Sequence, residues 1–166
     1  MKSEVLRKLL IGVLIVTGYG LEARSSSPDK STGKRLEFRI VIMGEIIDKE
    51  ATEAGFRTPL FSDETRLGFT DFEASDGVRV HAEDGEFRTP EEAKRYLDWN
   101  VARSSKILAQ GIKTDSKRKP VGYRAEVLLA PDQKQSAVMW TSGATFRQMI
   151  SKSLADAEEL AKRYGY

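Results

Sequence analysis

The feature that most constrains this sequence is the pattern of residues 121–164, where two alternating stretches precede a helical one. Residues 121–129 alternate apolar and polar side chains, and a period of two is typical of a strand with one face in a core. Residues 131–134 predict a turn and residues 136–141 alternate again, which together predict a hairpin. Apolar residues at spacings of three and four then predict one covering helix, with core-facing Phe146, Met149, Ile150, Leu154, Ala157, Leu160, Ala161 and Tyr164.

Three further strands are predicted before this region. Residues 36–43 alternate at first and then become apolar on both sides, as in a central strand. Residues 67–73 and 78–83 flank Asp76-Gly77, a strong turn signal, and predict a second hairpin. Residues 48–66 have no clear period, but Phe56, Leu60 and Phe61 are too apolar for a solvated loop, so we expect this segment to lie on the domain.

A long helix is predicted over residues 90–110. Thr89 is placed as N-cap, Pro90 takes the first helical position and Glu92 completes a capping box. Gly111 is placed to end the helix. The expected inward face consists of Ala93, Tyr96, Leu97, Val101, Ser104 and Leu108.

These elements follow the order β-β-β-α-β-β-α. Both helices have an apolar face that could cover the same antiparallel sheet. The sequence therefore predicts a single two-layer α+β domain over residues 35–166, with an antiparallel sheet of about four to five strands covered by two helices.

The first 23 residues have the form of a secretory signal peptide. Lys2, Arg7 and Lys8 precede an apolar run that is too short to span a bilayer comfortably. An uncleaved anchor and a buried helix are the competing interpretations. Residues 24–34 are polar and predict a flexible linker. With no cysteine for disulfides or lipidation, we expect a secreted or periplasmic bacterial domain without a stable membrane anchor after cleavage.

The overall charge gives no evidence for a polyanionic partner. The whole chain has a net charge of +2. Without residues 1–23 it keeps 24 basic and 23 acidic side chains, with both signs interspersed. This balance predicts no nucleic-acid partner and no electrostatic attraction to an anionic membrane.

No catalytic group, metal site or cofactor is predicted. The only histidine, His81, lies at the end of a short predicted strand, where a structural role is far commoner than catalysis. One histidine without cysteine cannot build a tetrahedral N/S metal site. The chain also lacks a Gly-x-Ser-x-Gly elbow, a P-loop and a calcium loop.

By exclusion, we expect a non-enzymatic module, a monomer or homodimer, that binds a protein or small ligand in the cell envelope. The alternatives are an acid/base hydrolase that uses a carboxylate pair and an assembly protein that associates through a sheet edge. The candidate binding residues are Lys117, Arg118 and Lys119 in a basic loop, and Trp99 with Arg95 and Arg103 on the helix. The basic loop either contacts an anionic ligand or phospholipid headgroup or is a solvated turn, and the solvated turn is the commoner case. Trp99 points away from the predicted core face, so it is either covered by residues 56–61, an exposed anchor for a partner, or stacked by an arginine.

Overall fold

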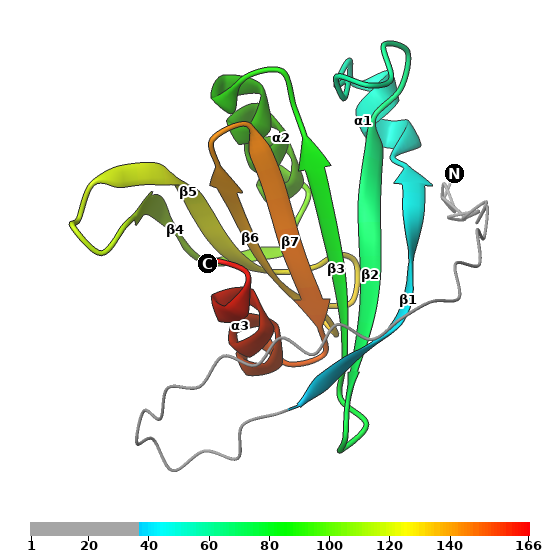
Figure 1. The fold of residues 1–166 in the computed structure, drawn as a ribbon, viewed down its shortest axis with the longest axis vertical. Helices are drawn as coiled ribbons and strands as arrows, with labels where there is room; N and C mark the ends of the chain where they lie inside the picture. Colours follow the sequence, from blue (N-terminus) through cyan, green and yellow to red (C-terminus); the bar gives the residue numbers. More distant parts are fainter. Residues whose placement is uncertain (1–36) are drawn as a thin grey trace.

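A computed structural model of the chain describes residues 37–166, and the predicted export signal and linker lie outside this range. In the described part, seven strands form one antiparallel sheet in the order β1-β2-β3-β7-β6-β5-β4 (Figure 1). The strands are β1 (Phe38–Ile47), β2 (Arg66–Ala74), β3 (Arg79–Glu86), β4 (Lys106–Thr114), β5 (Pro120–Leu128), β6 (Ser136–Ser142) and β7 (Thr145–Ser151). The helices are α1 (Lys49–Glu53), α2 (Pro90–Ala102) and α3 (Leu154–Arg163).

Both predicted hairpins are confirmed. β2 and β3 pair around a turn in which Gly77 has a φ of 84°, a conformation that glycine adopts without strain. β5 and β6 pair from Leu128 opposite Ser136 to Arg124 opposite Trp140. Residues 36–43 were predicted to be a central strand, but the strand that forms there, β1, lies at the edge of the sheet.

The sheet is covered on both faces near its middle. Along β6, Ala137 and Met139 pack in one apolar core with α2, while Val138 and Trp140 pack in a second core with α3. Because successive side chains of a strand point to opposite faces, the two helices must lie on opposite sides of the sheet. Figure 1 shows α3 in front of β6 and β7 and α2 behind them.

The predicted fold class is therefore wrong in its layers and in its strand count. The chain does form an α+β fold with an antiparallel sheet, but the described residues contain seven strands and three helices. Two errors of period account for most of the difference, because each predicted helix included a strand.

The helix predicted from Phe146 onward is a strand followed by a shorter helix. Phe146 and Gln148 belong to the face of β7 that α2 covers, and Met149 lies in the core beneath α3. A strand that is apolar on both faces places Phe146, Met149 and Ile150 at spacings that also fit a helix. Ile150 is thus a strand residue, and Leu154 is only partly buried at the start of α3.

The other predicted helix, residues 90–110, ends at Ala102, and residues from Lys106 onward form β4. Ala93, Tyr96, Leu97 and Val101 are buried as expected, whereas Leu108 is exposed on β4. The predicted N-cap is confirmed, since Thr89 Oγ1 accepts a hydrogen bond of 3.2 Å from Glu92 N. The carboxylate of Glu92 accepts from Arg88 N rather than from Thr89 N, which is a variant of the capping box.

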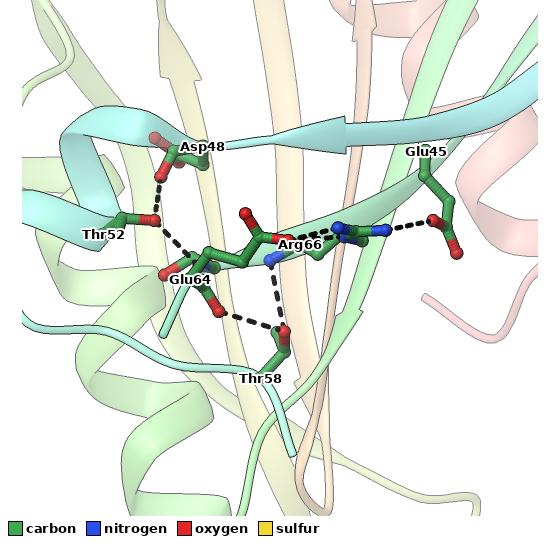
Figure 2. A network of polar contacts seen from close by, with 7 residues as sticks. Glu45, Asp48, Thr52, Thr58, Glu64 and Arg66 are labelled. Atoms are coloured by element: carbon green, nitrogen blue, oxygen red, sulfur yellow. Dashed lines mark hydrogen bonds and ion pairs between the residues drawn. The ribbon is translucent and has the colours of Figure 1, made fainter. Parts of the chain in front are cut away.

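The segment between β1 and β2 is folded onto the domain through α1 and a polar network (Figure 2). Asp48 caps α1 by accepting from Ala51 N, and Thr52 Oγ1 accepts from Thr65 N at 2.8 Å. Arg66 forms ion pairs with Glu64 and with Glu45 of β1, the latter at 3.2 Å. These contacts hold residues that lack a regular period, so they could not be found from hydrophobic spacing alone.

Candidate binding surfaces

The first candidate surface is the outer edge of β1. Among the described residues, β1 pairs only with β2, so the other side of its backbone has no strand partner. Four consecutive apolar side chains on it are roughly half exposed: Ile40 (56%), Val41 (51%), Ile42 (49%) and Met43 (59%). Ile47 at the end of the strand is also exposed. Such an edge can pair with another strand.

The exposure of β1 on both faces follows from where the helices lie. α2 packs on β5, β6 and β7, and α3 packs on β3, β6 and β7. A register shift between Ile40 and Ile42 further disturbs the alternation of the strand. The two charged side chains of β1 bind neighbours on β2, Arg39 to Glu73 at 2.8 Å and Glu45 to Arg66 at 3.2 Å. The rest of this edge is therefore apolar.

The second candidate surface is the β4–β5 hairpin, which projects from the sheet in Figure 1. β4 pairs with β5 as far as Thr114 opposite Pro120, whereas β5 pairs with β6 only from Arg124 onward. The distal part of the hairpin therefore forms its strand pairs only within itself. Ile112 and Tyr123 are exposed on this distal part, and Ile107 and Leu108 are exposed at the other end of β4.

A tight turn at the tip presents the predicted basic residues Lys117, Arg118 and Lys119. Asp115 Oδ1 accepts hydrogen bonds from Lys117 N at 2.8 Å and Lys119 N at 2.9 Å. Arg118 has a φ of 61°, in the left-handed region. All three basic residues are exposed. The carboxylate of Asp115, the one acidic residue of the tip, thus stabilises the turn by accepting hydrogen bonds from main-chain N–H groups.

A cleft of about 380 Å³ lies between the first turn of α2 and this hairpin. Its lining includes Pro90, Glu91, Lys94, Ile112, Val121 and Tyr123. The ammonium group of Lys94 is 2.5 Å from Asp98 Oδ2 and 4.7 Å from the centre of the Tyr123 ring. The ammonium charge of Lys94 is therefore already paired with Asp98. Glu91 is the one acidic residue in the lining, so the cleft does not bring together the two carboxylates that this kind of hydrolysis needs.

The other predicted binding residues gather at α1 and are well separated from the hairpin tip. Trp99 packs against Phe56 and Tyr96, with ring centres 5.6 and 5.7 Å away, and Arg103 lies 4.0 Å over its ring. Arg103 also forms an ion pair with Glu50, and Arg95 lies 5.6 Å over the Phe56 ring. Trp99 is half-buried, because Phe56 packs against it and Arg103 stacks on its ring. Leu60, which was expected to lie on the domain with Phe56, is instead 88% exposed.

His81 lies in a polar cluster on the sheet. Its Nδ1 is 2.5 Å from Asp71 Oδ1 and its Nε2 is 3.0 Å from Glu83 Oε1. Burial lowers the pKa of His81, but hydrogen bonds and charges from Glu83 and Asp71 outweigh it and raise the pKa to about 9. Gln148 donates to the other oxygen of Glu83. The imidazolium and both carboxylates therefore satisfy one another, which favours a structural role.

Sequence reasoning missed the apolar edge of β1 because a strand that is apolar on both sides predicts a central position. It missed β4 because Leu108 continued the helical spacing of α2. The tip residues were found through their charge.

No protein-family model, curated protein or solved structure matches this chain. None of the helices within residues 37–166 is long and apolar enough to cross a bilayer. The same residues contain no group of three His, Cys, Asp or Glu side chains that could hold a metal ion.

Proposed function

We propose that the protein is a non-enzymatic binding module that associates by strand addition at β1, and that its partner at this edge is a second copy of the chain. The observation that carries the proposal is the run Ile40 to Met43 of half-exposed apolar side chains on an edge that has no strand partner within residues 37–166. Edge strands are usually protected by charged residues, proline or a covering loop. In β1, the two charged residues pair with β2 on either side of residues 40–43, and these four residues carry no charge.

A second copy fits this edge in geometry and in charge. A two-fold axis beside β1 and perpendicular to the sheet would place the two β1 strands antiparallel, which is the arrangement of every strand pair among the described residues. β1 contains one basic and one acidic residue, Arg39 and Glu45. Its copies therefore carry no net charge that would oppose pairing, unlike two β4 edges with their adjoining basic residues.

A hydrolase that uses two carboxylates has less support. Asp71 and Glu83 converge, but both bind the His81 ring rather than line a cavity. The exposed apolar edge is the feature expected of a binding module, whereas an enzyme of this kind should have two free acidic groups in a concave site.

Sedimentation velocity of the full chain over a range of concentrations tests the proposal. We expect reversible dimers, and we expect Ile42→Lys to abolish them because a lysine on an edge strand opposes further pairing. Leu60→Lys is the matched control, since Leu60 is an apolar residue that is 88% exposed outside the sheet. A parent chain that stays monomeric, or equal dimerisation of the Ile42→Lys variant, would refute the proposal.

A further inference from the structure

The fold concentrates positive charge on the β4–β5 hairpin. Residues 106–124 contain six basic side chains and one acidic side chain: Lys106, Lys113, Lys117, Arg118, Lys119 and Arg124 against Asp115. The rest of the described range, residues 37–105 and 125–166, contains 14 basic and 21 acidic side chains. The near-neutral total therefore conceals a strongly basic hairpin on an otherwise acidic domain.

The basic side chains of the hairpin are not neutralised by the domain. Within residues 37–166, none of the six forms an ion pair with an acidic side chain. Burial, together with the nearby charge of Arg147, lowers the pKa of Lys113. Arg147 thus adds a further positive charge close to Lys113 of the hairpin.

The same hairpin exposes apolar side chains next to these charges. Ile112 is 58% exposed and pairs with Tyr123, which is 38% exposed, so the two apolar side chains share one face of the hairpin close to the basic turn. Lys113 and Arg124, the next residues along each strand, point to the other face. Ile107 and Leu108 are exposed beside Lys106 at the start of β4. Aliphatic and tyrosine side chains flanked by lysine and arginine suit the boundary between lipid headgroups and acyl chains.

We propose that the β4–β5 hairpin binds the surface of an anionic phospholipid bilayer, with the tip cations on the headgroups and Ile112 near the acyl boundary. This surface is distinct from the β1 edge, which lies at the opposite side of the sheet. A nucleic acid would use the same charges, but it would have no use for the exposed aliphatic side chains. Base stacking would also need a free aromatic face, and Lys94 lies over the Tyr123 ring.

Co-sedimentation of the full chain with phosphatidylcholine vesicles, with and without phosphatidylglycerol, tests this proposal. The triple variant Lys117→Ser, Arg118→Ser, Lys119→Ser should bind the anionic vesicles on the order of 100-fold more weakly, since each cation near such a surface contributes about a factor of five. The matched control replaces three exposed lysines on other elements, Lys49, Lys134 and Lys152, by serine. Because every variant keeps the same N-terminal residues, their contribution cancels in the comparison.

A second pair of variants separates the apolar contribution from the charge. Ile112→Ser should weaken vesicle binding several-fold, whereas Leu60→Ser should not change it. The proposal is overturned if the tip and control triple variants bind equally, if vesicles with and without phosphatidylglycerol bind equally, or if Ile112→Ser has no effect. Binding to duplex DNA without binding to anionic vesicles would also overturn it and would assign the hairpin to nucleic acid.

Discussion

The hydroxyl of Tyr96 donates a hydrogen bond of 2.7 Å to Asp48 Oδ2, which joins α2 to the start of α1 across 48 positions of the sequence. The other oxygen of the same carboxylate, Oδ1, accepts from Ala51 N at 3.0 Å and caps α1. Burial, with the charge and hydrogen bond of Asp48, raises the pKa of Tyr96 well above its usual value. One carboxylate therefore holds the irregular segment 48–65 against the core.

Replacing Tyr96 by Phe should lower the free energy of unfolding by about 2 kcal/mol, because it removes a buried hydrogen bond to a charged group. Urea denaturation measures this change. Tyr123→Phe is the matched control, since Tyr123 is exposed and its hydroxyl has no hydrogen-bond partner among the described residues. Equal stability of the two variants would show that the Tyr96 hydroxyl does not hold this segment.

The stability of the protein should fall as the pH rises from about 6.5 to about 9. The folded state raises the pKa of His81 from 6.5 to about 9, because the attraction of Glu83 and Asp71 outweighs burial. Because folding raises this pKa, the contribution of His81 to the free energy of unfolding is complete below pH 6.5. This contribution is lost as the pH rises through the folded-state pKa of about 9. His81→Gln should remove this dependence. Since His81 is the only histidine, its NMR titration gives the midpoint directly, and a midpoint at or below 6.5 would contradict the account.

Gly122→Ala should destabilise the β4–β5 hairpin where β5 passes the end of β6. A Cβ atom at this position would lie 2.1 Å from the carbonyl oxygen of Thr141, so β5 would have to move away from β6. We expect a loss of about 1–3 kcal/mol in the free energy of unfolding, as for other overpacked sites. Gly111→Ala provides the control, because a Cβ there meets nothing within 4 Å. Equal denaturation midpoints for the two variants would refute the close approach.

The local signals of the sequence were sufficient for both hairpins and for the start of α2. Asp76-Gly77 identified its turn, and Thr89 with Pro90 and Glu92 identified the helix start, because these depend on neighbouring residues only. The period failed where strands are apolar on both faces, as at Phe146 to Ile150. Two layers were therefore predicted instead of three. A strand covered by helices on both faces does not need to alternate apolar and polar side chains.

The two candidate surfaces depend on long-range arrangement, so the sequence could identify only parts of them. Lys117, Arg118 and Lys119 were found as a basic loop, but Lys106, Lys113 and Arg124 join them only because β4 pairs with β5. Likewise, Ile40 to Met43 predict a strand in a central position, and the edge position follows only from how the seven strands pair. Net charge averages over the whole chain, so it does not indicate that six basic side chains gather on one hairpin.

The most direct measurement of the central claim is amide hydrogen exchange of residues 39–47 as a function of protein concentration. If β1 pairs with β1 of a second copy, its outward amides should be protected at high concentration and should exchange faster on dilution. Amides of β4 should show no such change, and Ile42→Lys should leave β1 unprotected at every concentration. Exchange of β1 that is independent of concentration in the parent chain would contradict strand addition at this edge.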